Sequence, residues 1–465
     1  MKDLTKGNPF KQILLFVLPV MGGNLFQQLY SLADTIIVGN TVNADALTGV
    51  GLTGGIGFLI FGFIGGLTAG FGVRVAQRFG AQDEEGVRRA VATAFTLCLI
   101  ISLLLTAVCA PLTGVFLRLM STPEQFFDYA YYYLLITLLG IGANMLYNVV
   151  AAVLRAIGDS KTPLLFLVLS AFLNVGLDFA FILGCNMRYC GVALSTVLSQ
   201  LLSGIACLLY MYKRYPTLRF KRGDFKWNAK LVGGHLAVGL PMALQFSITG
   251  IGIIFRQTAL NLLNSAYPGV VTAYAAASKI DSLAAGLFPA LGVAMATFAG
   301  QNKGAGDMSR VKKGVGVGMI FALVLSAVGL AFSMGLYRPL MKLFLNTEKG
   351  GDAALYYDDM LAYAKHFLLI QGGCYPLLGA VNVLRNALQG IGKSFVTMLA
   401  GVTELAGRML ACFLFARLWG FTGVCFTDPV AWLAADIFLA IVYFVVMNAE
   451  LHRSPPQEAC PAESQ

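Results

Sequence analysis

Apolar stretches of 18 or more residues recur along this chain, and they restrict its fold more than any other feature. Each stretch is long enough to cross a bilayer core of about 30 Å as a helix. Only 12% of the residues are charged, whereas an average soluble domain has about 25%. A membrane β-barrel would show strands that alternate apolar and polar residues. The sequence therefore predicts an all-α polytopic membrane protein.

Twelve membrane-spanning helices account for these stretches. The first apolar run has no small-residue cleavage site, so we expect it to continue as the first span rather than to act as a signal peptide. The expected spans are residues 11–38, 46–76, 90–115, 127–153, 162–184, 190–212, 233–263, 270–299, 314–337, 361–386, 395–417 and 421–447.

Most of the 33 Lys and Arg residues fall on one side of this arrangement. With the N-terminus in the cytoplasm, the cytoplasmic segments hold the basic linker Tyr212–Lys230 and also Arg155 and Arg385. Lys and Arg accumulate in the cytoplasmic loops of membrane proteins. We therefore expect a multi-pass protein of the cell membrane with both termini in the cytoplasm. The net charge of +10 then needs no nucleic-acid partner.

Short segments of the first half return in the second half in the same order. LRAIGDS (Leu154–Ser160) matches LQGIGKS (Leu388–Ser394), and VRRA (Val87–Ala90) matches VKKG (Val311–Gly314). Several matches in one order indicate a duplication.

The duplication predicts two six-helix bundles. An even number of spans gives both units one orientation, so their pseudo-twofold axis runs along the membrane normal. The expected parts are an N-terminal lobe at 1–212, a basic cytoplasmic linker at 213–232, a C-terminal lobe at 233–450 and a cytoplasmic tail at 451–465.

A polar stripe runs along the first span and ends at an acid. The residues within about a third of the helix circumference are Asn24, Gln27, Tyr30, Ser31 and Asp34. An ionised carboxylate in hydrocarbon costs roughly 2.5–3.5 kcal/mol on insertion scales, so we expect Asp34 to face the bundle interior. Pro19 removes a backbone hydrogen bond earlier in the span and is a candidate hinge.

Two further spans carry polar residues one helical turn apart. Asn174 and Asp178 lie at i, i+4 in the fifth span, and Asn144 and Asn148 do so in the fourth. Intramembrane acids commonly mark ion pathways, so Asp34 and Asp178 together predict a site that takes up and releases a cation. The alternative is that both acids only hydrogen-bond neighbouring helices together.

The remaining membrane charges have less specific interpretations. Glu404 and Arg408 lie at i, i+4 and predict a structural ion pair. Arg256 either lines a cleft or pairs with an acid. The candidates for lining the substrate cleft are Gln27, Asn144, Arg256 and Met242.

The nine cysteines form no CxxC motif or Cys/His cluster, so we expect no metal site. Cys185 and Cys190 flank a short external loop and are either a disulfide or two free thiols.

Four segments together resemble the multidrug and toxic compound extrusion (MATE) family. They are SLADTIIVG, RFGAQDEEGVRRA (Arg78–Ala90), LRAIGDSKTP (Leu154–Pro163) and LNVGLDFAFI (Leu173–Ile182), and the similarity extends over about residues 8–450. The Asp34 and Asp178 pair resembles the DinF-like branch. That resemblance implies a cation-coupling site in the N-terminal lobe made of Asp34, Asp178, Asn174, Tyr30, Asn148 and Tyr133, with Tyr129 as the alternative to Tyr133. The seventh and tenth spans lack the acids of the NorM-like branch.

The resemblance implies a secondary antiporter, not an enzyme. We expect export of organic cations and other drugs in exchange for H⁺ or Na⁺ by alternating access, with no cofactor besides the coupling ion. The expected partners are small-molecule drugs and membrane lipid, and we expect a monomer. The rival is a flippase for lipids or lipid-linked oligosaccharides from the same superfamily, which would need a strongly basic cleft.

Overall fold

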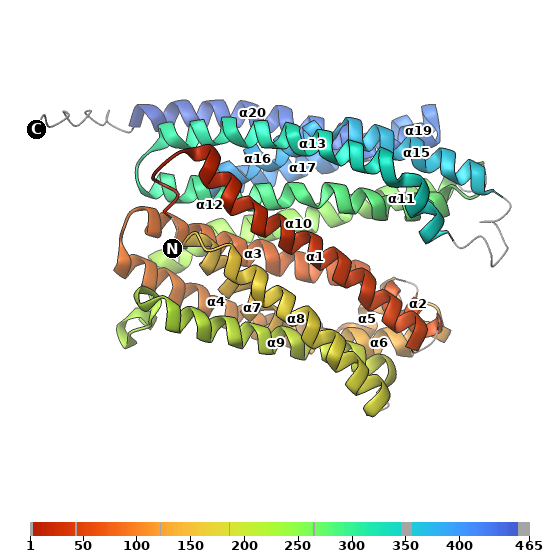
Figure 1. The fold of residues 1–465 in the computed structure, drawn as a ribbon, viewed down its shortest axis with the longest axis horizontal. Helices are drawn as coiled ribbons and strands as arrows, with labels where there is room; N and C mark the ends of the chain where they lie inside the picture. Colours follow the sequence, from red (N-terminus) through yellow and green to blue (C-terminus); the bar gives the residue numbers. More distant parts are fainter. Residues whose placement is uncertain are drawn as a thin grey trace, which may run out of the picture.

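Helices form every regular element in the described part of the chain. The computed structural model describes residues 3–41, 44–120, 122–185, 187–263, 266–345 and 356–453, without the side chains of residues 29–41, 44–47 and a few isolated positions. Most helices run along the long axis of the molecule (Figure 1). Within the described ranges, ten helices are long and apolar enough to cross a membrane, or up to twelve spans are present when each of two bent pairs counts as one span. The predicted all-α polytopic fold is confirmed.

The first half of the chain forms one side of the molecule (Figure 1). Its helices are α1 (Pro9–Thr41), α2 (Ala44–Leu52), α3 (Gly54–Gly80), α4 (Glu84–Cys109), α5 (Thr113–Leu119), α6 (Glu124–Leu139), α7 (Ile141–Ala156), α8 (Lys161–Phe179) with the π-helical turn η1 (Ala180–Gly184), and α9 (Arg188–Arg214). Two short 3₁₀ turns, η2 (Pro216–Leu218) and η3 (Arg222–Phe225), lie in the linker.

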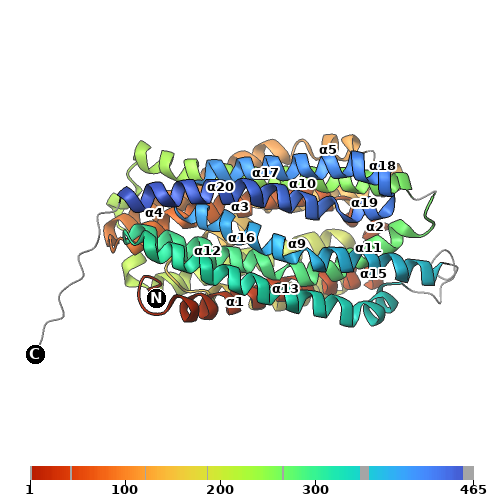
Figure 2. The same cartoon turned by 90° about the horizontal axis from the view of Figure 1, so that it is seen from above.

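The second half forms the other side, and Figure 2 shows its helices from above. They are α10 (Ala229–Leu263), α11 (Val270–Ala285), α12 (Leu287–Gly304), α13 (Met308–Phe344), α15 (Tyr357–Gly373), α16 (Tyr375–Gly390), α17 (Ser394–Leu410) with the π-helical turn η5 (Ala411–Phe415), α18 (Ala416–Trp419), α19 (Phe421–Cys425) and α20 (Thr427–Arg453).

Several expected continuous spans are broken in the structure. The second span divides at Thr53 into α2 and α3. The fourth bends by 48° between α6 and α7, where Gly140 separates the two helices, and the tenth bends by 43° between α15 and α16. Hydrophobicity alone predicts a span's length and not its bend, because bends follow from packing against neighbouring helices.

Each half has its own apolar core. Residues of α3, α4 and α7 build the first, including Leu67, Phe71 and Val150. Residues of α12, α13 and α16 build the second. The first part of α1 belongs to this second core, because Phe16 is buried among residues of the C-terminal half such as Phe288. Helix α1 therefore links the two halves.

The glycine-rich segment in the first half brings the halves into close contact. A Cβ atom on Gly66 would lie 2.6 Å from the Met242 carbonyl oxygen, and one on Gly70 would lie 2.5 Å from the Gly239 Cα. Helices α3 and α10 thus meet backbone to backbone at a small-xxx-small motif, as membrane helices often do.

Candidate functional site

A buried acid and its polar partners lie between α8 and α9. Asp178 is fully buried, and the Ser195 hydroxyl donates a hydrogen bond to its carboxylate. One turn earlier on α8, the Asn174 side-chain amide donates to Ser195 Oγ at 3.3 Å and to Thr196 Oγ1 at 3.2 Å. The i, i+4 spacing places Asn174 and Asp178 on the same face of α8, which packs against α9. The site therefore has one carboxylate, one amide and two hydroxyls.

Two members of the predicted site belong to the first span, and the structure does not describe their side chains. Tyr30 and Asp34 lie in α1, but their side chains are outside the described residues. Tyr133 lies in α6 and is partly buried. The grouping of these three residues with Asp178 therefore stays a prediction.

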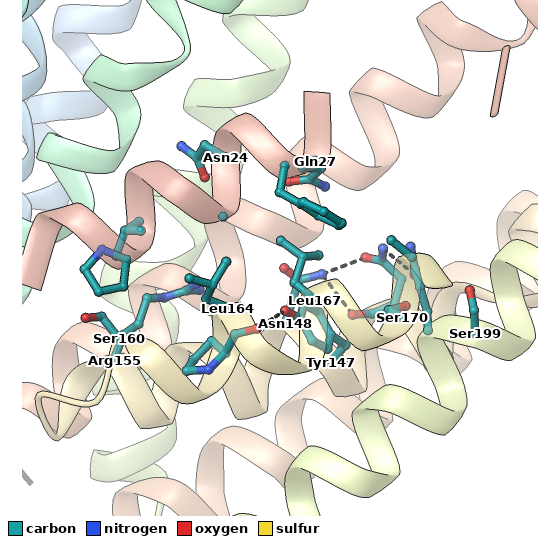
Figure 3. A pocket seen from close by; sticks show the side chains of 18 residues that line it. Asn24, Gln27, Tyr147, Asn148, Arg155, Ser160, Leu164, Leu167, Ser170 and Ser199 are labelled. Carbon is teal, nitrogen blue, oxygen red and sulfur yellow. Dashed lines mark hydrogen bonds between the residues drawn. The ribbon is translucent and has the colours of Figure 1, made fainter. Parts of the chain in front are cut away.

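A polar cavity lies along the same two helices, and its lining includes Ser170, one turn before Asn174 on α8, and Ser199, one turn after Ser195 on α9 (Figure 3). It has a volume of about 150 Å³ and is bounded by α1, α7, α8 and α9. Among the predicted residues, Pro19, Gln27, Asn144 and Asn148 line it. The described lining residues are Pro19, Val20, Gly23, Asn24, Phe26, Gln27, Asn144, Tyr147, Asn148, Arg155, Ser160, Pro163, Leu164, Leu167, Ser170, Ala171, Ser199 and Gln200.

Amide side chains hold one wall of the cavity in place. Asn144 Nδ2 donates to Gln200 Oε1 at 2.9 Å, and Asn148 Nδ2 donates to Asn144 Oδ1 at 3.0 Å. The Tyr147 hydroxyl donates to the Pro163 carbonyl at 2.9 Å and ties α7 to α8. These bonds join α7 to both α8 and α9, so the wall is a connected polar network.

Two predicted cleft residues lie elsewhere. Met242, on α10, lines a smaller cavity between the halves that also contacts Arg155. Arg256 forms an ion pair with Asp428, and its guanidinium lies 5.5 Å from the ring centroid of Tyr274. Of the two interpretations left open for Arg256, the structure shows pairing with an acid.

Arg155 is a cavity residue that the sequence analysis assigned to a cytoplasmic loop. It lies in the last turn of α7 and lines the cavity together with Ser160 (Figure 3). The sequence holds a signal for this position, because Asn144, Asn148 and Arg155 occur at i, i+4 and i+11. These positions share one face of a helix with 3.6 residues per turn.

A buried charge network occupies the C-terminal half. The predicted partners Glu404 and Arg408 contact each other at 3.0 Å. Glu404 also contacts Arg385 at 2.6 Å, and Arg408 Nε donates to Asp428 at 2.9 Å. Arg385, which the sequence analysis counted on the cytoplasmic side at the end of the expected span 361–386, lies within α16, which continues to Gly390. The network thus connects α10, α16, α17 and α20.

The cysteines and metal-ligating residues add no further chemistry in the described ranges. Cys185 and Cys190 are free thiols. No group of three or more His, Cys, Asp or Glu residues that could hold a metal occurs in the described ranges.

A helical bundle that crosses the membrane up to twelve times and holds a buried acid beside a polar cavity has the features of a secondary transporter. The family model described as MatE matches residues 19–180 and 242–414. The chain therefore belongs to the MatE family, whose members are transporters and not enzymes.

Curated relatives and solved structures agree with this assignment. The chain is 30% identical over 396 residues to the probable multidrug resistance protein YpnP of Bacillus subtilis (strain 168), with 84% of each chain covered. It is 25% identical over 425 residues to the probable multidrug resistance protein NorM of Thermotoga maritima, covering 89% of this chain and 88% of that one. A solved structure described as the outward-facing conformation of a multidrug resistance MATE family transporter has a TM-score of 0.87 at 23% identity. That match covers 96% of this chain and 98% of that one, and it shows the shared fold.

Proposed function

We propose that this protein exports organic cations and other drugs in exchange for H⁺ or Na⁺ by alternating access. The relatives named above as multidrug resistance proteins support the substrate class. The observation that carries the coupling proposal is the fully buried Asp178 in a membrane helix beside a polar cavity. Acids within membrane spans are costly, and those present commonly mark ion pathways.

The proposal takes residues 1–212 and 233–450 as the two lobes that move relative to each other. The linker 213–232 and the tail 451–465, of which residues 454–465 lie outside the described part, are placed in the cytoplasm with both termini. The excess of Lys and Arg in these segments supports that orientation. The protein acts as a monomer in this proposal.

The hydrogen bonds around Asp178 suggest how it exchanges a proton. Ser195 Oγ lies within hydrogen-bond distance of the carboxylate and, at 2.9 Å, of the Val192 carbonyl oxygen. When Asp178 is ionised, the hydroxyl donates to it. When Asp178 gains a proton, the new O–H donates to Ser195 Oγ, and the hydroxyl donates to Val192 instead. Both protonation states are thus satisfied without moving either helix.

The other predicted coupling residues complete the ion site in this proposal. Asp34 and Tyr30 on α1, Tyr133 on α6 and Asn148 on α7 supply further oxygen ligands near Asp178 and Asn174, as in the DinF-like branch. Carboxylate and amide oxygens suit Na⁺ as well as a proton relay, so the site serves either ion.

In this proposal, helix α1 couples ion binding to the movement of the two lobes. Its first part packs in the C-terminal core through Phe16, and its middle part lines the N-terminal cavity through Gln27. Pro19 lies between these two parts and interrupts the backbone hydrogen bonds. A ligand shifts a conformational equilibrium only through different affinities for the two states. The proposal therefore requires that the ion at Asp178 and the drug in the cavity bind most tightly to different conformations of α1.

Transport in reconstituted vesicles tests the proposal. Purified protein in liposomes is given a fluorescent cationic dye, and a pH gradient and a Na⁺ gradient are imposed separately. We expect one of the two gradients to drive dye transport in the wild type, and Asp178→Asn and Asp34→Asn to abolish it. Asp436→Asn is the matched control, because Asp436 is a buried membrane acid in the other half.

The outcomes separate the possibilities. If Asp178→Asn retains gradient-driven transport, Asp178 has a structural role and the coupling mechanism is wrong. If the wild type moves no dye under either gradient, drug export itself is rejected.

A further inference from the structure

The cavity beside the proposed coupling site contains a cationic group, Arg155, that has no counter-ion among the described residues. No hydrogen bond or ion pair joins Arg155 to any other residue in the described part of the chain. No Asp or Glu occurs among the described lining residues. A partly buried guanidinium without a protein partner favours an anion from outside the protein, because charge-assisted hydrogen bonds are strong where water is scarce.

The acid nearest in sequence is already engaged elsewhere. Asp159 Oδ2 accepts a hydrogen bond from the Tyr215 hydroxyl at 2.6 Å, and Oδ1 accepts from the backbone N–H groups of Lys161 and Thr162. Burial and the bond to Asp159 both raise the pKa of Tyr215, so the phenol stays protonated and keeps donating. Asp159 is thereby held at the start of α8 and does not neutralise Arg155.

A second donor lies at the same end of the cavity. Ser160 is 5% exposed, lines the cavity, and its hydroxyl makes no hydrogen bond to a described residue. Arg155 and Ser160 come from the two helix ends that meet there, the last turn of α7 and the residue before α8. Figure 3 shows both residues at one end of the cavity and Ser199 at the other. Arg155 and Ser160 therefore lie at the same end of the cavity (Figure 3).

The cavity volume limits how much of a ligand it can hold. A volume of about 150 Å³ matches a cavity that accommodates a single benzene-sized group. A drug-sized molecule would thus place one ring and its charged substituent in the cavity, with the remainder outside it. Apolar side chains such as Leu164 and Leu167 supply a surface for that ring.

We propose that this end of the cavity binds the anionic group of an amphipathic substrate, a carboxylate or a phosphate, through Arg155 and Ser160. The inference rests on the proposed export function and extends its substrate class from cations to molecules that carry an acidic group. The cationic part of a zwitterionic substrate would then lie toward the amide oxygens of the cavity wall. A phospholipid head group and a soluble drug offer the same anionic chemistry.

Two dyes that differ only in this group provide the test. Rhodamine 110 carries a free carboxylate on its pendant phenyl ring, and rhodamine 123 is the methyl ester of the same molecule. Both are assayed with full-length protein in phosphatidylcholine vesicles, for wild type, Arg155→Gln, Arg155→Lys and Ser160→Ala. Lys161→Gln controls for general electrostatics, because Lys161 is an exposed cation next to Ser160 in the chain and does not line the cavity.

We expect Arg155→Gln to weaken the apparent affinity for rhodamine 110 about tenfold, as for loss of a charge-assisted bond. Rhodamine 123 should change less than about twofold, and its continued transport shows that the variant is folded. Arg155→Lys should recover part of the rhodamine 110 affinity, Ser160→Ala should lose a smaller part, and Lys161→Gln should change neither dye. Inhibition by added phosphatidylglycerol that Arg155→Gln relieves would identify a lipid head group as an occupant of the same anion site.

Equal losses for both dyes, or no loss for either, would overturn the anion site. Failure of the wild type to move either dye under any gradient would instead reject the proposed export function. The two failures are distinguishable.

Discussion

The side-chain amides of Gln77 and Gln301 make equivalent hydrogen bonds across the two halves of the protein. Gln77 Nε2 on α3 donates to the Gly390 carbonyl at 2.8 Å, and Gln301 Nε2 on α12 donates to the Ala156 carbonyl at 2.7 Å. Gln301 also accepts from the backbone N–H of Leu4 at 2.9 Å, so this contact lies beside the N-terminal segment. The sequence repeat pairs Gln77 with Gln301 and Ala156 with Gly390. The two bonds are therefore related by the internal symmetry.

Removing both side-chain amides should weaken the contact between the two halves at Gln77 and Gln301. Each bond contributes about 1 kcal/mol, so Gln77→Leu with Gln301→Leu should shift the conformational equilibrium by about tenfold or more toward separated halves. Distances between spin labels at the exposed residues Glu84 and Lys312 report the separation. An unchanged distance distribution would show that the bonds do not hold the halves together.

Adding a methyl group at this contact should separate the halves more than the loss of the two glutamine hydrogen bonds does. A Cβ on Gly80 would lie 1.8 Å from the Gln301 carbonyl oxygen, and one on Gly304 would lie 1.9 Å from that of Gln77. Gly80→Ala and Gly304→Ala should each open this end in the same spin-label measurement. Gly65→Ala on α3 is the control, since its Cβ would meet nothing within 4 Å. Normal closure in both variants would contradict the backbone contact.

Neutralising one acid of the buried charge network should destabilise the protein. Glu404→Gln leaves Arg385 and Arg408 without the carboxylate that contacts both. Breaking a buried pair from one side costs about 3–5 kcal/mol, so the thermal unfolding temperature in detergent should fall clearly. Glu85→Gln removes an exposed pair with Arg89 and should have little effect. If both variants unfold at a similar temperature, losing the buried Glu404 carboxylate costs no more free energy than losing the exposed one of Glu85.

Two acids of α20 should respond to substitution in opposite ways. Asp428 contacts both Arg256 and Arg408, whereas both carboxylate oxygens of Asp436 are buried without a hydrogen-bond partner in the described structure. Asp428→Leu should therefore lower the unfolding temperature. Asp436→Leu should raise it, because it removes an unsatisfied polar group that costs about 1–3 kcal/mol. Destabilisation by Asp436→Leu would reveal a partner for that carboxylate.

Replacing the proline of α1 should slow transport without removing dye binding. Pro19→Ala restores a backbone donor inside the helix and stiffens it between its two packing environments. Fluorescence polarisation measures dye binding, and vesicle assays measure the transport rate. Leu18→Ala is the control at an exposed neighbouring position. Wild-type transport rates in Pro19→Ala would rule out a hinge at this residue.

The amino-acid sequence by itself determined the features that depend on local periodicity. Long apolar runs predicted the membrane helices, and i, i+4 spacing predicted the shared face of Asn174 and Asp178 and the contact between Glu404 and Arg408. These relationships follow from helix geometry, which repeats every 3.6 residues whatever surrounds the helix.

Tertiary structure decided the features that join distant segments. Arg155 lines the cavity because α1, α8 and α9 enclose it together with α7. Asp428 meets Arg256 and Arg408 because α10, α17 and α20 converge. The reciprocal bonds of Gln77 and Gln301 likewise need both halves in place. Sequence spacing cannot supply such contacts, because they depend on how whole helices bend and pack rather than on the order of residues within one helix.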